Sequence, residues 1–258
     1  MNPLPPPIRS GLESLLALLF PEVCQLCGEE RGEAASGYLC TPCRSRLPRI
    51  APPMCDRCGL PYPGDITGPF DCLNCRDLDL AFTQARSLLA AKGTGLELVH
   101  RYKYHRAFWF EPLFESLFRE KAAPGIDPAA WDLIVPVPLH PVKHREREFN
   151  QAEHLARLLG RATGIPVDAP LLRRAEHPAT QTTLTRRARS RNVHGAFTLA
   201  RSLPADSTRL ILVDDVLTTG ATTSACARVL RDAGATQINV RLEEGGVKRI
   251  AITDNGRG

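Results

Sequence analysis

Eight cysteines arranged in four CxxC pairs constrain this chain more than any other feature. The pairs lie within 52 residues, and they join Cys24 with Cys27, Cys40 with Cys43, Cys55 with Cys58, and Cys72 with Cys75. A CxxC turn can direct two thiolates at one ion, and two such turns supply the four ligands of a tetrahedral zinc site. The segment is therefore expected to bind two zinc ions, which would supply much of its folding energy.

An internal repeat indicates which pairs share an ion. Glycine follows both the first and the third pair, and it permits the positive φ that a knuckle turn often requires. Twelve residues separate Cys27 from Cys40, and thirteen separate Cys58 from Cys72. The pattern predicts two ribbons in tandem, with the first four cysteines on one ion and the last four on the other, rather than a cross-braced pair. The ninth cysteine, Cys226, is interpreted as a packed thiol in a helix.

A disulfide framework is the alternative interpretation of so many cysteines, and it requires an oxidising compartment. The longest apolar run near the start, residues 15–20, is much shorter than the roughly 20 residues of a membrane span. It follows a proline-rich start with a single arginine and precedes no small-residue cleavage site, unlike a secretory signal. We therefore expect a cytoplasmic protein with reduced cysteines and no membrane span.

Beyond Cys75 the sequence changes to alternating helices and strands. Apolar residues recur at helical spacing in three segments, which are residues 94–107, 108–122 and 150–163. The last of these opens on Asn150, a good helix cap. Short apolar strands are predicted within residues 131–140 and 210–213. Strands separated by helices indicate an α/β fold in which a parallel sheet carries flanking helices.

The stretch LILVDDVLTTGATT, residues 210–223, predicts a ligand site. Its apolar start is typical of a central strand covered on both faces, and Asp214 and Asp215 follow at the carboxyl end, where ligands of open α/β sheets bind. The loop around Gly220 then opens a helix predicted from about residue 221 to 231, so its backbone N–H groups can hold a phosphate. Acceptors for hydroxyl groups beside donors for a phosphate indicate a phosphorylated sugar.

Two other interpretations of the apolar strand and its acids are less consistent with the sequence. A P-loop NTPase needs a GxxxxGK[ST] motif upstream, and this chain has none. A receiver domain needs a phosphorylatable aspartate much earlier in the chain. Neither explains a Thr-Thr-Gly loop placed directly after the acids.

This stretch resembles the signature with which type I phosphoribosyltransferases bind 5-phosphoribosyl 1-diphosphate (PRPP). The resemblance implies that Asp214 and Asp215 hold the ribose hydroxyls and act as the catalytic pair. It also implies that the following loop holds the 5′-phosphate. The implied PRPP-binding residues are Asp214, Asp215, Val216, Thr218, Thr219, Gly220, Ala221 and Thr222.

The rest of the chain resembles the ComF branch of that family, which includes the competence protein ComFC and GntX and carries a cysteine-rich zinc module. The matching segments are IVPVPLHPVKHREREFNQAEHLA and QTTLTRRARSRNVHGAF, and in the second the family spacing is kept by Gln181, Leu184, Arg189, Asn192 and Phe197. One departure is Glu148, where the family usually has glycine. The implied fold is a type I phosphoribosyltransferase-like sheet over residues 79–244, after a helical lead-in at 1–20 and a double zinc ribbon at 21–78.

The resemblance implies magnesium-dependent displacement of diphosphate from the ribose by an acceptor that the sequence does not identify. Magnesium would be held mainly by substrate oxygens and water. The loop over residues 136–141 would face the diphosphate, and Lys103, Arg147 and Arg189 are candidate anion contacts. The alternative is a non-catalytic PRPP sensor or a protein that handles single-stranded DNA, with competence proteins as partners. Its DNA contacts would come from a basic stretch that contains Arg173, Arg174, Arg186, Arg187, Arg189 and Arg191.

The tail, from about residue 232, resembles a fragment of the ATPase domain of the mismatch-repair protein MutL. Its matching residues are Asp254, Asn255, Gly256 and Gly258, whereas the upstream Glu and Asn that such an ATPase uses are absent. A fragment this short cannot be an ATPase, so we interpret residues 245–258 as an atypical tail after a junction. The sequence TQINVRLE within it alternates in a way compatible with a strand at a sheet edge.

Overall fold

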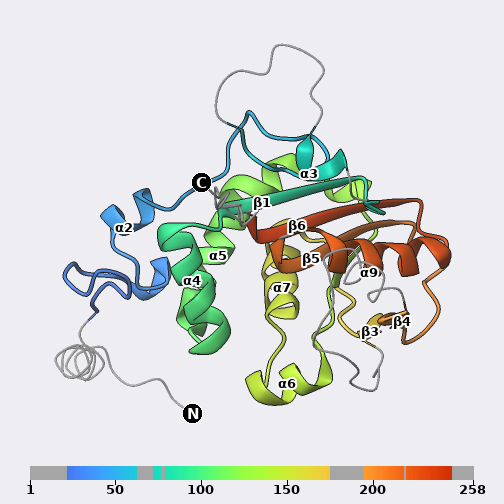
Figure 1. The fold of residues 1–258 in the computed structure, drawn as a ribbon. Coiled ribbons are helices and arrows are strands. Elements are labelled where there is room, and N and C mark those ends of the chain that lie inside the picture. Colours follow the sequence, from blue (N-terminus) through green and yellow to red (C-terminus); the bar gives the residue numbers. More distant parts are fainter. Residues whose placement is uncertain (1–21, 63–71, 77–78, 175–194, 218, 246–258) are drawn as a thin grey trace, which may run out of the picture.

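A four-stranded parallel sheet forms the centre of the fold (Figure 1). The computed structural model describes residues 22–62, 72–76, 79–174, 195–217 and 219–245. The strand order is β1 (Gln84–Ala90), β6 (Gln237–Gly245), β5 (Arg209–Leu217) and β2 (Leu133–Pro136). All three neighbouring pairs are parallel, which confirms the predicted parallel sheet.

Helices cover both faces of the sheet because the strand residues alternate between two cores. Ile211 and Val213 of β5 belong to the core that contains α4 (Gly93–Tyr104), α5 (Glu111–Leu117) and α7 (Gln151–Thr163). Leu210 and Leu212 belong to the core of α9 (Ala221–Asp232) and of a small antiparallel pair, β3 (Leu172–Arg174) and β4 (Phe197–Leu199). A strand apolar at every position therefore serves both faces, as the sequence predicted.

The helices follow the predicted segments closely. Asn150 caps α7 as expected, since its side chain accepts a hydrogen bond from the backbone N–H of Ala152 at 3.2 Å. The segment 108–122 is not one helix: it divides into η2 (Phe108–Phe110), α5 and the π-helical η3 (Phe118–Ala122). Pro112 stands in the first turn of α5, where it can begin a helix but cannot continue one.

The position predicted for the last strand was wrong. β6 lies between β1 and β5 and not at an edge, and Ile238, Val240 and Leu242 pack into the core that contains α9. Its sequence alternates because Asn239 and Arg241 occupy the other face, where they are also buried. The chain is therefore part of the sheet as far as residue 245, and the matches to MutL at residues 254–258 lie outside the described residues.

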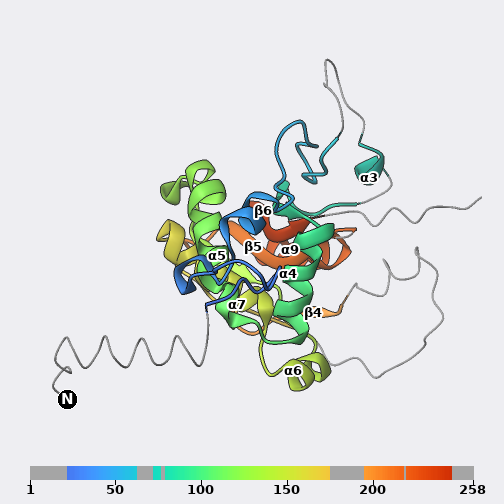
Figure 2. The ribbon, with the colours of Figure 1, turned by 90° about the vertical axis from the view of Figure 1, so that its left-hand side faces the viewer.

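The two cysteine ribbons pack on different faces of the sheet. Cys24, Cys40 and Cys43 join the core that contains α4, α5 and α7, whereas Cys55 and Cys58 join the core that contains α9. Figure 2 shows the first ribbon in front of α4 and α5, with helix α3 (Leu73–Arg76) of the second ribbon apart from it. The ribbons therefore share the hydrophobic cores of the sheet as well as having cysteine clusters of their own.

Side-chain bonds to backbone oxygens fasten each ribbon in place. Arg101 of α4 donates to the carbonyl of Gln25 in the first ribbon. Arg57 of the second ribbon donates to the carbonyl of Leu80 at 2.7 Å, and Arg86 of β1 donates to that of Asp56 at 2.8 Å. No helix among the described residues is long and apolar enough to span a membrane.

Candidate functional site

The carboxyl ends of β5 and β2 meet at the predicted ligand site. The backbone N–H of Val137, just beyond β2, donates to the carbonyl of Val213 at 2.8 Å, so the loop after β2 begins beside Asp214. Asn150 donates from Nδ2 to the carbonyl of Val137 at 3.1 Å and ties the same loop to the start of α7. The two loops that the sequence assigned to one ligand are therefore brought together.

Asp214 and Asp215 form a compact acidic pair with one cation against it. The backbone N–H of Asp215 donates to Asp214 Oδ1 at 2.8 Å, and Lys103 Nζ lies 2.9 Å from Asp215 Oδ2. Loss of hydration raises the pKa of Asp214 to about 8, and the neighbouring charge of Asp215 adds to the rise. The side chain keeps some exposure, so a ligand can still reach it.

The loop after the acids has the backbone expected of a phosphate cradle. Gly220 has a φ of +74° and immediately precedes α9. Its carbonyl accepts from Thr223 Oγ1 at 3.0 Å and from the backbone N–H of Ser224 at 2.8 Å. Thr219 Oγ1 accepts from the N–H of Ala221 at 3.4 Å, while Thr218 lies outside the described residues. The chain thus turns sharply at Gly220 to place the first turn of α9 beside the acidic pair.

Of the three candidate anion contacts, only Lys103 touches the acidic pair. Arg147 instead lies over the ring of Tyr104, with its guanidinium carbon 5.0 Å from the ring centre. Both residues line a cavity of about 370 Å³ between the end of α4 and α6 (Pro141–Arg147). Arg189 lies outside the described residues.

Glu148 shows why the family usually has glycine at this position. It ends α6 with a φ of +64° and a ψ of 3°, a left-handed conformation that glycine adopts at little cost. Its carboxylate pairs with Arg106 at 2.7 Å, and Arg106 itself has a φ of +50°. The glutamate is therefore directed at a neighbouring cation rather than at the acidic pair.

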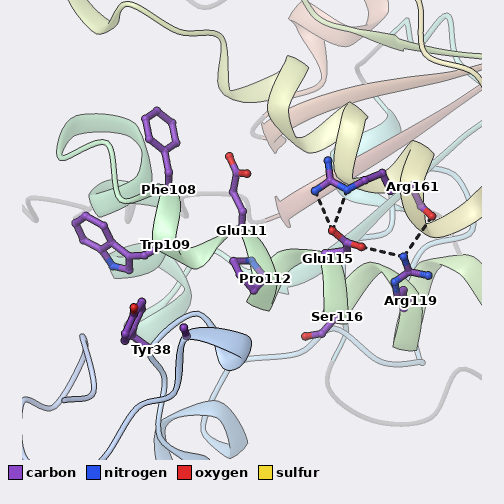
Figure 3. Close-up of a pocket in the computed structure, with 10 residues that line it drawn as sticks. Tyr38, Phe108, Trp109, Glu111, Pro112, Glu115, Ser116, Arg119 and Arg161 are labelled. Carbon is purple, nitrogen blue, oxygen red and sulfur yellow. Dashed lines mark hydrogen bonds and ion pairs between the residues drawn. The ribbon is translucent and has the colours of Figure 1, made fainter. Parts of the chain in front are cut away.

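A larger cavity, of about 610 Å³, lies elsewhere, between the first ribbon and α5 (Figure 3). Aromatic side chains of Tyr38, Phe108 and Trp109 line one end of it. At the other end Glu115 binds both Arg119 and Arg161, at 2.8 Å each, and these arginines hold the pKa of Glu115 below its usual value. Because that carboxylate neutralises both arginines, the cavity lacks the excess charge that a sugar phosphate requires.

The cysteines form the two clusters that the repeat predicted. Cys24, Cys27, Cys40 and Cys43 make the first, and Cys55, Cys58, Cys72 and Cys75 make the second, with all four sulfurs of each cluster within 4.8 Å of one another. The measured Sγ···Sγ separations are 3.8 Å for Cys27 and Cys40, 3.8 Å for Cys55 and Cys75, and 3.7 Å for Cys58 and Cys72. A tetrahedron with zinc–sulfur bonds of about 2.3 Å has edges of about 3.8 Å, so both donor sets fit zinc.

The second cluster has an outer partner that the sequence did not reveal. Tyr62 Oη donates a hydrogen bond to Cys72 Sγ at 2.7 Å. Such contacts orient a metal ligand and stabilise its thiolate. The corresponding backbone bonds, from the N–H groups of Cys43 to Cys40 Sγ and of Cys58 to Cys55 Sγ, measure 3.4 and 3.5 Å. Tyr62 lies between the third and fourth cysteine pairs, where no spacing signal marks it.

Relatives among characterised proteins decide the family. The DNA utilization protein YhgH of Salmonella typhi is 31% identical over 228 residues, which cover 86% of this chain and 96% of that protein. The chain belongs to the family of ComF and YhgH proteins. Competence protein F of Haemophilus influenzae is 29% identical over 80% of this chain and 90% of its own length, and competence protein ComFC of Bacillus subtilis is 29% identical over 76% and 79%.

The family assignment agrees with the cysteine clusters. A double zinc ribbon domain model matches residues 15–77, which contain all eight clustered cysteines, so the two clusters of this ComF protein are zinc-ribbon sites. These comparisons give no support to the MutL interpretation of the tail.

Two solved structures are similar to part of the ComF chain. The glutamine PRPP amidotransferase of B. subtilis is 22% identical, with a TM-score of 0.34 over 50% of this chain and 25% of that one. The allosteric regulatory enzyme of purine biosynthesis is 23% identical, with a TM-score of 0.35 over 51% and 24%.

Proposed function

We propose that this ComF protein binds PRPP with magnesium and transfers its phosphoribosyl group to an acceptor. The observation that carries the proposal is the meeting of Asp214 and Asp215 with the loop at Gly220, at the carboxyl end of β5 and beside the end of β2. Carboxylates accept hydrogen bonds from sugar hydroxyls, and the N–H groups that open α9 attract a phosphate. Val216, Thr218, Thr219, Ala221 and Thr222 complete the proposed donor site.

The acidic pair suits a reaction that develops positive charge on a sugar. Displacement of diphosphate from the anomeric carbon passes through an oxocarbenium-like state, and a fixed negative charge beside the ring stabilises it. A carboxyl with a pKa of about 8, such as Asp214, is largely protonated in the free protein at neutral pH. A cationic ligand complex would favour its ionised form, so its charge would appear when the substrate is bound. Magnesium, when bound, would neutralise the leaving diphosphate, largely through substrate oxygens and water.

The test is the effect of Mg–PRPP on thermal unfolding. We expect PRPP to raise the melting temperature of the zinc-loaded protein, because a ligand that binds only the folded state stabilises it. The double variant Asp214→Ala, Asp215→Ala should show no rise. Absence of a rise in the wild-type protein would overturn the proposal. Release of diphosphate from PRPP in the presence of candidate acceptors then tests for the transfer itself.

A second candidate function is the handling of single-stranded DNA, with or without sensing of PRPP. The names of the relatives, a DNA utilization protein and two competence proteins, favour it. Of the predicted basic stretch, Arg173 and Arg174 are described: Arg173 Nε donates to Thr198 Oγ1 at 3.0 Å, and Arg174 lies 5.2 Å over the ring of Phe197. Arg186, Arg187 and Arg191 lie outside the described residues. Retention on single-stranded DNA at about 0.15 M salt supports this function, and retention only at much lower salt opposes it.

A further inference from the structure

The cavity between α4 and α6 gathers positive charge next to the acidic pair. It has a volume of about 370 Å³ and is lined by Lys103, Tyr104, Arg106, Lys143, Glu146 and Arg147. Four of these six side chains are cations and one is a carboxylate. Lys103 connects the cavity to the acidic pair, since the same amine that lines the wall contacts Asp215.

Two of the cations already have carboxylate partners and two do not. Lys103 is paired with Asp215, and Arg106 with Glu148. Within the described part of the chain, neither Lys143 nor Arg147 forms an ion pair, and Arg147 only contacts Tyr104, through a hydrogen bond of 3.5 Å and its place over the ring. With Glu146 as the one further carboxylate on the wall, the cavity keeps an excess of positive charge.

The needs of the helices do not explain the position of Lys143. Basic residues in the last turn of a helix favour its dipole, and Lys103 and Arg147 both occupy such positions. Lys143 is the third residue of α6, in the first turn, where a positive charge gains nothing from the dipole. A cation there, facing others across a cavity, is placed to meet an anion from outside the chain.

We propose that this cavity binds a phosphate or diphosphate group through Lys143 and Arg147, and that Lys103 moves from Asp215 to that group when it binds. The step deepens the proposed function, because release of Asp215 would free its carboxylate for the ribose. The group has two chemical sources, the diphosphate of PRPP or a phosphate on the acceptor.

The test uses inorganic pyrophosphate, which has no ribose, in calorimetric titrations of the zinc-loaded protein at about 0.15 M salt. We expect the wild-type protein to bind it and the double variant Lys143→Ala, Arg147→Ala to bind at least about tenfold more weakly, since a charged hydrogen bond contributes about 1.5–3 kcal/mol and tenfold corresponds to about 1.4 kcal/mol. The matched control Lys121→Ala, Arg231→Ala removes the same charge from exposed positions and should bind like wild type. Equal affinity in wild type and the first variant, or no binding at all, overturns the proposal.

Further arms identify the source and keep the two proposals apart. If saturating PRPP excludes pyrophosphate from the wild-type protein, the cavity holds the diphosphate of the donor. If both bind together, it holds a phosphate of a second ligand. The variant Asp214→Asn, Asp215→Asn should retain pyrophosphate binding, because Lys103 is then free. A protein that binds pyrophosphate through Lys143 and Arg147 but shows no thermal response to PRPP would refute the proposed function alone.

Discussion

Lys103 Nζ on α4 lies 2.9 Å from Asp215 Oδ2 at the end of β5, and only 16% and 17% of the two side chains are exposed. This pair explains how two adjacent carboxylates coexist at the mouth of the sheet. Lys103 balances the charge of Asp215, while Asp214 is kept largely protonated by its loss of hydration. The free protein thus already holds one cation where the proposed ligand would bring a positive charge.

Lys103→Met should destabilise the protein more at pH 8 than at pH 5. At pH 5 only Asp215 is charged, whereas near pH 8 Asp214 also ionises and two carboxylates would face each other without a cation. Leaving a partly buried charge unpaired costs on the order of 2 kcal/mol. Urea unfolding at both pH values measures the loss, with the exposed Lys121→Met as control. An equal loss at the two pH values would show that Lys103 acts by packing alone.

Asp214→Asn should become progressively more favourable to stability as the pH rises. The pKa of Asp214 is about 8 in the folded protein, against an ordinary value of 3.8. Between these values the unfolded chain has lost a proton that the folded protein keeps, so the wild type loses stability as pH rises through this window. Asparagine does not titrate. The difference in unfolding free energy, variant minus wild type, should therefore grow from pH 5 to pH 8 by at least about 1 kcal/mol, and a constant difference would contradict it.

The sequence predicted the parts of this molecule in which local pattern fixes structure. Cysteine spacing gave the two clusters, and the apolar run before Asp214 gave a central strand, because both depend on residues close together in the chain. The contact between Lys103 and Asp215 joins residues 112 positions apart, and the sequence could offer Lys103 only as one of three cations. The place of β6 was wrong for a related reason: alternation reports two different faces, but it does not report that both are covered.

Loss of one cysteine should remove one zinc ion and leave the other. Metal analysis of the purified wild-type protein should give two zinc ions per chain, one for each cluster. Cys40→Ser should give one, because the remaining cluster lies on the opposite face of the sheet. Cys226→Ala is the control, since Cys226 is buried outside both clusters and the variant should keep two ions. Two ions in the Cys40 variant would mean that three cysteines suffice.

Gly220→Ala should weaken both stability and the response to PRPP. The residue has a φ of +74°, and an added Cβ would lie 3.1 Å from Leu80 Cδ2. A left-handed alanine costs about 1 kcal/mol or more, and relief of the strain would shift the N–H groups that open α9. Gly125→Ala is a fair comparison, because nothing lies within 4 Å of its added Cβ. Thermal unfolding with and without Mg–PRPP measures both effects, and a full PRPP response in Gly220→Ala would argue against a phosphate at this loop.

Glu148→Gly should tighten the binding of pyrophosphate with little net change in stability. Glycine relieves the left-handed conformation at a φ of +64°, for a gain of up to about 1 kcal/mol. The change also breaks the ion pair with Arg106, whose side chains are 50% and 66% exposed and which therefore contributes about 0–1 kcal/mol. Arg106 would then add its charge to the cavity that contains Lys143 and Arg147.

Glu148→Gln separates the effect of backbone strain from that of charge. Glutamine keeps the strained backbone and removes the carboxylate, so it should tighten pyrophosphate binding as glycine does while losing some stability. Calorimetry at two salt concentrations measures the affinities, and the gain should shrink as salt screens Arg106. Tighter binding in the glycine variant alone would mean that backbone freedom at the end of α6, and not the released charge of Arg106, limits access to the cavity.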